Sequence, residues 1–357
     1  MLTDAAKEIR IVALQATRGV NYWSRRPVIR MDLRVGAFEE ISSAEVPGFT
    51  ESLVRVMPGL LEHQCSIGAP GGFLLRLRRG TYAPHIIEHV ALELQQMIGV
   101  NVGFGRTRGG DQAGEYTLVF EHHHEHVGMR AAALALEIVQ RAFGGALWSI
   151  DASLDELRTL LGTPDAPPVA AHVWGAVTGG AHRAEAQADL RRRLGAVGGE
   201  ENGDGIVVDV SPAYLLQVGL PYRTSDLAIV LDTELSDVPE RYRAPDRARR
   251  LVSIVADAVP GDGVVVCPAG EWEIQDYARE RQCRVAIFAG DDSVSRRDAR
   301  VAMAVGRVRD GRILVERYAD VRDCGPLDPT RPAAPQVAAA LGAWVMARDG
   351  GGDRGAS

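Results

Sequence analysis

The sequence predicts an α/β protein of two domains: an α+β N-terminal domain containing a helix with an H-x-x-E-H motif, then an α/β domain with a mostly parallel sheet. Three observations favour this fold class. The 357 residues exceed what one compact core usually holds. Strand and helix patterns mix over residues 9–145. Beyond residue 168, short apolar runs alternate with helical stretches, which is typical of a buried parallel sheet covered by helices.

The N-terminal domain is expected over residues 1–150. Its strands should alternate apolar and polar side chains, its helices should repeat apolar side chains every three or four positions, and glycine or proline should mark the breaks. The expected helices are residues 50–63 (interrupted by Pro58), 84–98 and 128–143; the expected strands are residues 9–14, 28–33, 73–77 and 115–121, with a glycine-rich loop over residues 99–110.

A linker is expected over residues 151–168, with a short helical stretch and a proline-rich end. The C-terminal domain follows over residues 169–348, and residues 349–357 are expected to form a disordered tail. In this domain, continuous apolar runs predict buried strands and periodic segments predict helices. The expected strands are residues 206–210, 227–231, 263–267 and 284–288, and the expected helices are residues 183–194 and 247–258.

Composition excludes several classes of protein. A net charge of −7 gives no general attraction to nucleic acid or to an anionic membrane. No apolar run approaches the roughly 20 residues that span a bilayer, and the N-terminus lacks the apolar core of a secretory signal. Cys65, Cys267, Cys283 and Cys324 are far apart without a C-x-x-C pair, which argues against a disulfide framework or a cysteine zinc site. We therefore expect a cytoplasmic protein with no nucleic-acid or membrane partner.

The chain contains one lysine, Lys7, and nearly all its positive charge is arginine. A P-loop needs a lysine on the transferring phosphates, and Lys7 follows no glycine-rich loop. ATP is therefore not an expected cofactor, and ATP-dependent ligase activity is not expected either.

Residues 85–89 form the motif His-Ile-Ile-Glu-His inside an expected helix. Positions four apart lie one turn apart on the same face, so His85 and His89 can direct nitrogens at one ion. Glu88 lies beside them, where it can act on a metal-bound water. Two imidazoles and a third protein ligand suit Zn²⁺. The alternative is that both histidines only satisfy a buried helix, and a shared metal is the more economical partner for them.

The third ligand is open between several carboxylates. Glu93 lies one turn beyond His89, too far along the helix to reach the ion, and is expected to orient His89 from a second shell. Glu121 is the preferred ligand, because it ends a separate strand and can approach from another direction. Glu115 and Glu137 are the fallbacks.

Two further segments attract functional interpretations. Residues 121–126 hold four histidines, but alternation along a strand separates them onto two faces, so a polar surface is favoured over one metal site. The glycine-rich segment 102–110 follows a helix and precedes a strand, which is the wrong order for a dinucleotide loop. We expect it to bring Arg106 to the metal site as a substrate-binding residue, with Arg76 as a second one. Solvated arginines in an ordinary loop are the alternative.

Seven segments between residues 8 and 145 then become recognisable: 19–24 (GVNYWS), 45–49 (EVPGF), 62–66 (EHQCS), 71–73 (GGF), 80–81 (GT), 85–94 (HIIEHVALEL) and 102–108 (VGFGRTR). In order and spacing they resemble the N-terminal domain of cyanophycin synthetase. The resemblance implies a domain that binds cyanophycin, a poly-aspartate chain with an arginine on each side chain. It also implies, as in some members, a zinc metallopeptidase-type site with His85 and His89 as ligands and Glu88 as general base. Glu93 and Glu121 match the family pattern as well.

Residues 169–347 resemble the family's Mur-ligase-like central domain more faintly. Residues 178–183 (TGGAHR) lack the Gly-Lys-Thr ending of its P-loop, and Glu234-Leu235 stands where the family has a metal-binding Asp-His. We find no counterpart of the family's ATP-grasp domain or of its C-terminal ligase domain. The resemblance thus implies a degenerate Mur-ligase-like domain that serves as a scaffold, a dimerisation surface or a polymer-holding surface.

We therefore expect a zinc-dependent hydrolase that cleaves cyanophycin or a related Asp/Arg peptide, with Glu88 as general base. The alternative is a non-catalytic polymer-binding or regulatory paralogue of cyanophycin synthetase without ligase activity. A preserved motif beside an eroded ligase domain favours the hydrolase. The expected partners are the polymer and further copies of the same chain in a homo-oligomer.

Overall fold

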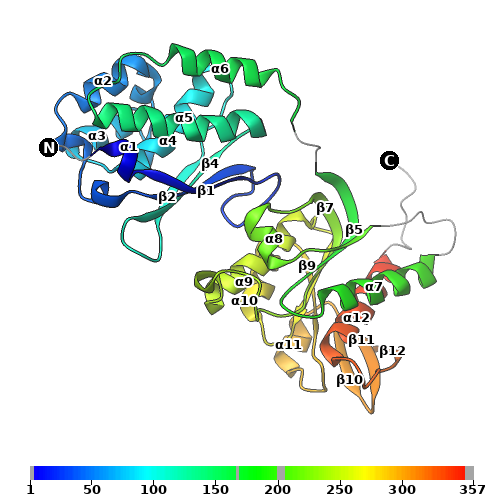
Figure 1. Ribbon diagram of the computed structural model, residues 1–357. Coiled ribbons are helices and arrows are strands. Elements are labelled where there is room, and N and C mark those ends of the chain that lie inside the picture. Colours follow the sequence, from blue (N-terminus) through cyan, green and yellow to red (C-terminus); the bar gives the residue numbers. More distant parts are fainter. Residues whose placement is uncertain (1–3, 166–168, 199–205, 350–357) are drawn as a thin grey trace. The chain divides into compact units, whose positions relative to one another are not determined.

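The computed structural model describes residues 4–165, 169–198 and 206–349, so the expected disordered tail falls outside the described residues from residue 350 on. The chain divides into two compact units. Unit 1 is Met1–Arg18 with Arg26–Pro168, and unit 2 is Gly19–Arg25 with Val169–Ser357 (Figure 1). Within the described ranges, no helix combines the length and the apolar character needed to cross a membrane.

Unit 1 is built on a four-stranded antiparallel sheet of order β1-β2-β4-β3. Its strands are β1 (Arg10–Ala16), β2 (Val28–Arg34), β3 (Gly105–Gly109) and β4 (Glu115–Glu121). Its α-helices are α1 (Ala5–Glu8), α2 (Phe49–Val56), α3 (Gly72–Arg79), α4 (Ala83–Met97), α5 (Glu125–Phe143) and α6 (Asp151–Leu161). Five of these elements (β1, β2, β4, α4 and α5) lie within three residues of the expected bounds at each end, which confirms the α+β fold of this part.

Helices α4 and α5 pack together against the sheet, and their apolar side chains form one core with it (Figure 1). The core takes Ile86, Ile87 and Val90 from α4, all fully buried. Proline at the first turn starts α4, because its missing N–H and fixed φ suit that position. The helix is thus buried on nearly every side, and its polar side chains need partners inside the protein.

Two expectations for unit 1 are wrong. The expected strand over residues 73–77 is helix α3, in which Phe73 and Leu77, one turn apart, are both buried. Gly71 and Gly80, with φ of 82° and 102°, lie at the two ends of this helix, and glycines at these positions do not distinguish a short helix from a short strand. The expected loop over residues 99–110 contains strand β3, whose polar sequence gives no apolar alternation to reveal it.

Unit 2 contains an eight-stranded sheet of order β12-β11-β10-β9-β8-β7-β5-β6. The six strands from β10 to β6 are parallel, and the last two are antiparallel, which confirms the mostly parallel sheet. The strands are β5 (Ala170–Thr178), β6 (Val207–Asp209), β7 (Tyr222–Val230), β8 (Val264–Pro268), β9 (Arg284–Phe288), β10 (Val305–Arg309), β11 (Arg312–Arg317) and β12 (Asp320–Pro326).

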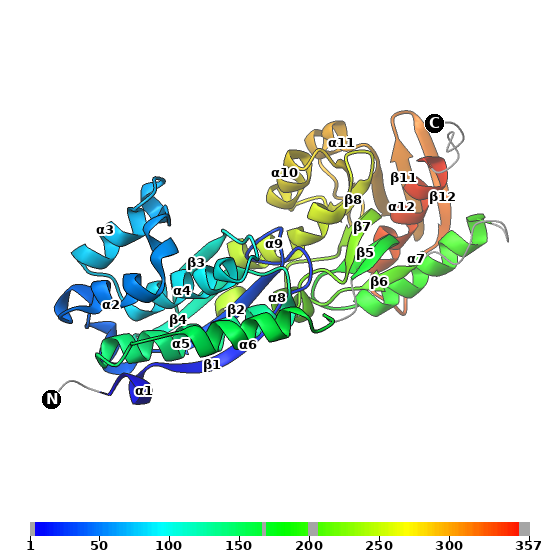
Figure 2. The ribbon, with the colours of Figure 1, turned by 90° about the horizontal axis from the view of Figure 1, so that it is seen from above.

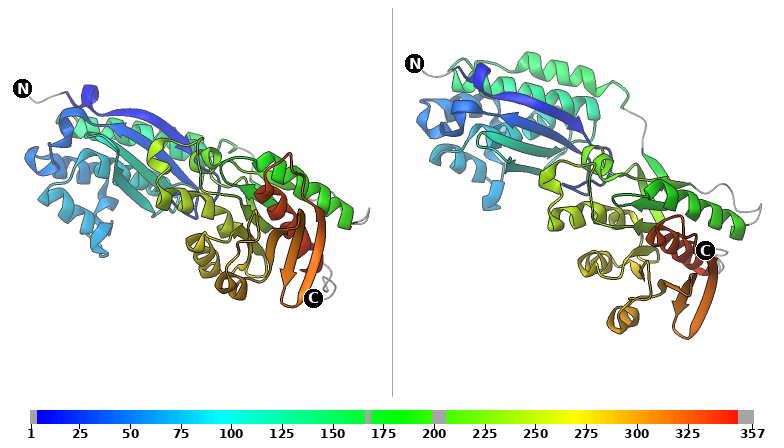
Figure 3. Two further views of the ribbon diagram at one scale, coloured as in Figure 1. Left: turned by 90° about the horizontal axis from the view of Figure 1, so that it is seen from below. Right: turned by 60° about the horizontal axis from the view of Figure 1, so that its bottom comes forward.

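Helices cover both faces of this sheet, as the continuous apolar strands require. Helices α7 (Arg183–Gly198) and α12 (Ala333–Asp349) lie side by side on one face, and α8 (Pro212–Gln217), α9 (Pro245–Ser253) and α10 (Trp272–Glu280) cover the other (Figures 2 and 3). Helix α11 (Arg296–Val301) lies between β9 and β10 in the chain. The expected helices and strands of this half are present, and the additional elements are β5, β10, β11, β12, α8, α10, α11 and α12.

The segment Gly19–Arg25, which separates β1 from β2, belongs to unit 2. The N–H of Leu220 donates to the carbonyl of Val20 at 2.7 Å. The ring of Tyr22 lies edge-on to that of Tyr242, with 5.3 Å between centroids. Arg25 pairs with the buried carboxylate of Asp257 at 2.7 Å. This segment is therefore part of the core of unit 2 although it is encoded inside unit 1.

Candidate functional site

A pocket of about 1030 Å³ opens in unit 1 beside α4. It is lined by the turns before α3, by one face of α4 and by the segment that leads into β3. The lining side chains that carry charge or donate to metals are Glu62, His63, Cys65, Arg76, His85, Glu88, His89, Arg106 and Arg108. All of them come from residues 62–108, so the pocket is built from one short stretch of sequence.

His85 and His89 lie one turn apart on α4 and face this pocket, as the motif predicts. Their ring centroids are 4.8 Å apart. The ring of Phe73 stacks on that of His89, with centroids 3.9 Å apart and planes at 17°, and fixes its orientation. On the other side of His85, Nδ1 bonds the hydroxyl of the buried Thr81 at 2.9 Å. Both imidazoles are therefore held in place before any ligand arrives.

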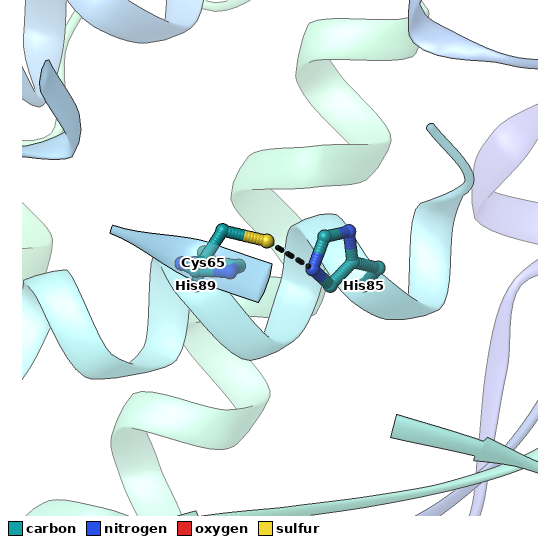
Figure 4. A group of neighbouring side chains, drawn as sticks. All are labelled: Cys65, His85 and His89. Carbon is teal, nitrogen blue, oxygen red and sulfur yellow. Dashed lines mark hydrogen bonds between the residues drawn. The ribbon is translucent and has the colours of Figure 1, made fainter. Parts of the chain in front are cut away.

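Cys65 joins the two histidines to form a three-residue cluster (Figure 4). It lies in a short 3₁₀ turn, Cys65–Ile67, and its Sγ is 3.3 Å from Nε2 of His85. One potential ligand atom from each of Cys65, His85 and His89 lies within 4.8 Å of the others, and no other such group occurs among the described residues. A thiolate with two imidazoles is a ligand set that suits Zn²⁺.

His89 is also connected to a carboxylate through a second imidazole. Nδ1 of His89 lies 2.8 Å from Nδ1 of His63, and Nε2 of His63 lies 3.1 Å from Oε2 of Glu93. With both rings neutral, one arrangement satisfies every contact: His63 donates from Nε2 to Glu93 and accepts at Nδ1 from His89. Nε2 of His89 is then left as a bare lone pair. Glu93 thus reaches His89 through His63, not directly as the sequence suggested.

Burial keeps both pocket histidines neutral. It lowers the pKa of His85 to about 4, with a further contribution from the positive charge of Arg76. It lowers the pKa of His89 to about 2, and the neighbouring His85, His63 and Arg76 act in the same direction. A neutral imidazole is the form that binds metals, so protons on these two rings do not compete with an ion near pH 7.

Glu88 projects towards β3 on the same side of the helix. Burial raises the pKa of its carboxyl to about 7, against the opposing effects of the Thr107 hydroxyl and Arg106. The hydroxyl of Thr107 donates to Oε2 at 2.5 Å. The close approach requires glycine at position 105, because a Cβ there would lie 2.6 Å from Oε1. The carboxyl is therefore packed against β3 with its ionisation balanced near neutral pH.

The structure does not place Glu121 with the histidines. Its carboxylate accepts the backbone N–H groups of Gly103 and Phe104, both at 3.2 Å, and pairs with Arg26 at 3.0 Å. Burial acts to raise the pKa of Glu121, but these donors together with His123 lower it below its usual value. The carboxylate thus ties the segment before β3 to the end of β4. The third residue that lies beside the two histidines is Cys65, not Glu121. The fallbacks are also paired elsewhere, Glu115 with Arg34 and Glu137 with Arg130.

The other site residues from the sequence divide into two groups. Arg76 and Arg106 both line the pocket, and Arg76 donates to the hydroxyl of Ser66 at 3.2 Å. The histidine run over residues 121–126 contributes nothing to it. The buried His122 lies 2.9 Å from the carbonyl of Thr17, while His123 and His124 contact different carboxylates. The histidines thus contact separate partners, as expected, but His122 is buried and does not belong to the expected polar surface.

Sequence reasoning missed four residues of the site: Cys65, His63, Thr81 and Thr107. Cys65 was dismissed because no second cysteine accompanies it, although a single thiolate can complete a histidine pair. A signal was available, since His63 and Cys65 stand two positions apart in one of the recognisable motifs, EHQCS. The two threonines carry no chemical signature of their own and are found only by their contacts.

Comparison with known proteins places this pocket in a described domain. Residues 29–143 match the family model of the cyanophycin synthase-like N-terminal domain. Cyanophycin synthetase of Synechocystis sp. is 42% identical over 157 residues, covering 43% of this chain and 18% of its own length. Those of Trichormus variabilis and Geminocystis herdmanii are 47% identical over 134 residues (37% of this chain, 15% of that protein) and 41% identical over 154 residues (43% and 18%).

Residues 29–143 of unit 1 are therefore similar to a domain that occurs in a class of ligases. The relatives in that class are named cyanophycin synthetase, and the matching model is named for the N-terminal domain of such proteins. The chain spans less than a fifth of the length of these relatives. The similarity thus concerns one domain and does not indicate whether this chain has the activity of the longer proteins.

Solved Mur ligases are among the similar structures. MurF from Acinetobacter baumannii is 13% identical with a TM-score of 0.33, covering 52% of this chain and 47% of that one. MurF from Thermotoga maritima in complex with ADP is 13% identical with a TM-score of 0.35, covering 57% and 51%. Likeness at this level describes neither a substrate nor an activity.

The comparisons contradict the zinc-hydrolase hypothesis. The relatives that share the pocket domain at 41–47% identity are all named for a synthetase, which is a ligase, and none for a peptidase. The H-x-x-E-H order was too short a pattern to define the reaction, and the metallopeptidase interpretation of Glu88 as a catalytic base falls with it. The cluster of Cys65, His85 and His89 as a possible metal site is independent of that interpretation.

Proposed function

We propose that unit 1 is a non-catalytic binding module for cyanophycin or a closely related Asp/Arg polymer, in a paralogue of cyanophycin synthetase without ligase activity. One observation carries the proposal. Every residue that lines the pocket lies between Glu62 and Arg108, inside the region 29–143 that matches the cyanophycin synthase-like domain. The part of the chain shared with proteins named for this polymer is the part that forms the pocket.

The charges in the pocket suit such a ligand. An arginine attached to an aspartate side chain keeps its own carboxylate and its guanidinium, so each repeat presents both signs. The pocket likewise presents Arg76 and Arg106 for carboxylates, and Glu62 and Glu88 for guanidinium groups. Arginine and carboxylate form two parallel hydrogen bonds, which gives such pairs direction as well as strength.

We further propose that the pocket holds a Zn²⁺ ion on Cys65, His85 and His89. The donor set, the neutral imidazoles and the hydrogen bonds that the outer ring nitrogens of His85 and His89 make with Thr81 and His63 support it. The ion would add positive charge next to Arg76, where carboxylates of the polymer would bind. It would also hold the 3₁₀ turn that carries Cys65 against α4.

Binding of fluorescently labelled cyanophycin to the full chain, measured by anisotropy, tests the proposal. Arg106→Ala and Arg76→Ala should each weaken binding by about 10-fold or more, because a charged hydrogen bond contributes roughly 1.5–3 kcal/mol. Arg78→Ala is the matched control: Arg78 lies on the same helix as Arg76, is exposed and does not line the pocket. Poly-aspartate and poly-arginine should both bind more weakly than cyanophycin.

Three results would oppose the proposal. They are no saturable binding by the wild type, equal binding by Arg78→Ala and Arg106→Ala, or equal affinity for poly-aspartate. Removal of the metal by a chelator tests the second part separately, because polymer binding through the arginines alone would survive it. Metal content is measured on the same samples by mass spectrometry.

A further inference from the structure

The loop between β5 and α7 in unit 2, residues 179–182, is filled by a side chain of its own chain. Arg183, the first residue of α7, turns back over the loop, and its side chain is only 17% exposed. Nη1 donates to the carbonyl of Gly179 at 2.7 Å and also to that of Gly180. Nε donates to the carboxylate of Asp209 at 3.0 Å, and Nη2 lies 3.8 Å from that of Asp237.

The polarity of this loop is the reverse of a phosphate-binding loop. A phosphate loop directs backbone N–H groups at its ligand and adds a lysine. Here the carbonyl oxygens of Gly179 and Gly180 face the centre of the site, together with two carboxylates. The N–H of Gly180 is already used, because it donates to Oδ1 of Asp232 at 2.7 Å. A Cβ at position 180 would lie 2.1 Å from the carbonyl oxygen of Glu234, so the loop is also closed by packing.

The oxygens of this site come from three neighbouring strands. Asp209 ends β6, the two carbonyls follow β5, and Asp237 lies in the segment after β7. These strands are adjacent in the order β7-β5-β6. One guanidinium therefore links the carboxyl ends of three parallel strands, at the edge of the sheet where open α/β proteins place their ligands.

From this geometry we infer that the β5–α7 loop is a guanidinium-binding site occupied in cis by Arg183, and that unit 2 takes no nucleotide phosphate there. An anion entering the loop would meet the carbonyl oxygens of Gly179 and Gly180 and the carboxylates of Asp209 and Asp237. A planar guanidinium, with five N–H donors, satisfies this set, and a lysine ammonium, with three, does not reach all of it. The inference concerns unit 2 and is independent of the function proposed for unit 1.

Thermal unfolding of the full chain tests the assignment. Arg183→Ala should lower the melting midpoint of unit 2 by several degrees, because it leaves Asp209 and Asp237 without their shared cation. Low-millimolar guanidinium should restore part of this loss in Arg183→Ala and restore nothing in the wild type. Arg191→Ala is the matched control, since Arg191 is an exposed arginine on the same helix. Arg183→Lys should fall between the wild type and the alanine variant.

ATP with Mg²⁺ is added to the wild type in a second arm, and no saturable upward shift of the midpoint is expected. A saturable shift would overturn the inference, because it would show that the loop accepts phosphate. So would an Arg183→Ala midpoint equal to that of Arg191→Ala, or a loss in Arg183→Ala that guanidinium reverses no better than NaCl does. If Arg183→Ala does not fold, the same guanidinium and salt comparison is made on Arg183→Lys.

Discussion

The pocket on α4 in unit 1 and the β5–α7 loop in unit 2 both contain many polar groups, but the hydrogen bonds of those groups differ between the two regions. In the pocket, Nδ1 of each histidine makes a hydrogen bond to a neighbouring side chain, so that Nε2 of His89 is left with a lone pair. In the loop, Arg183 takes up the carbonyls and carboxylates itself. The first arrangement prepares groups for a ligand, and the second uses them within the fold.

This difference shows how to separate a binding site from a structural polar cluster. A count of charged or metal-donating residues does not distinguish the two regions. The distinction lies in the second contact of each group. In the pocket, Thr81 and His63 each contact one ring nitrogen, and the second nitrogen of His85 contacts only Cys65, another potential ligand. Beside the loop, Asp209 and Asp232 each accept a hydrogen bond from unit 2 itself.

Loss of a ligand should have the largest effect. His89→Ala should reduce bound zinc from about one ion per chain to none, because only two protein ligands, Cys65 and His85, would remain. Metal content after dialysis against zinc is the measurement. His126→Ala is the control, since His126 is exposed and belongs to the histidine run outside the pocket. Equal zinc in both variants would mean that the pocket does not hold the metal.

The hydrogen-bonded series His89–His63–Glu93 forms a relay, and a steric change at its outer end, Glu93, should have the next largest effect. A Cβ at position 59 would lie 2.1 Å from Oε1 of Glu93, so Gly59→Ala must displace that carboxylate from His63. We expect a loss of about 1–3 kcal/mol in unfolding free energy from overpacking, and about 10–100-fold weaker zinc binding. Gly103→Ala is the control, because a Cβ there meets nothing within 4 Å. A stable variant with unchanged zinc affinity would contradict the relay.

Removing only the charge at the end of the relay should have a smaller effect. Glu93→Gln keeps an oxygen that can accept from Nε2 of His63 but loses the negative charge that strengthens this hydrogen bond. Zinc affinity should fall about tenfold, at the lower end of the range for outer partners of metal ligands. Competition with a chromophoric chelator measures it. An unchanged affinity would show that His63 orients His89 without help from the carboxylate.

The smallest effect concerns His122, a buried histidine whose ring is used in the fold. Burial lowers its pKa below 6.5, although the contact with the Thr17 carbonyl opposes the shift. Below pH 6.5 the unfolded chain therefore binds a proton that the native chain does not, so stability is present above this pH and is lost as the pH falls. His122→Asn should make the loss between pH 6.5 and 5.5 shallower by up to about 1.4 kcal/mol per pH unit.

Urea unfolding at the two pH values, in the presence of a chelator, measures this slope. His126→Ala, which changes an exposed ring on the same segment, should keep the slope of the wild type. A slope that His122→Asn leaves unchanged would show that this ring is not held neutral in the native protein.

The sequence predicted the framework of the site better than its chemistry. The position of α4 and the common face of His85 and His89 followed from helical periodicity, which depends on local sequence alone. The apolar strands of unit 2 were found for a similar reason. The third member of the cluster was not found, because Cys65 reaches the histidines through a turn that has no periodic pattern, and because a carboxylate was preferred to a lone thiol.

Glu121 shows why spacing could not settle the ligand set. Its place at the end of a strand was predicted correctly, and its direction was not. Whether that carboxylate points to the histidines or to the amides of Gly103 and Phe104 depends on the path of the segment before β3, a strand that the sequence did not reveal. The sequence did not reveal that Arg183 fills the β5–α7 loop of unit 2. The segment TGGAHR resembles a phosphate loop without its lysine, and only the structure shows that Arg183 folds back over it.

The short segment Gly19–Arg25 has a consequence for how the protein is made. Their partners Leu220, Tyr242 and Asp257 are synthesised more than 190 residues after these seven residues. Until unit 2 has been synthesised, the connection between β1 and β2 lacks these three partners. The two units are thus not independent folding blocks in time, and an expressed fragment that begins at residue 169 would lack Tyr22 and Trp23 from its core.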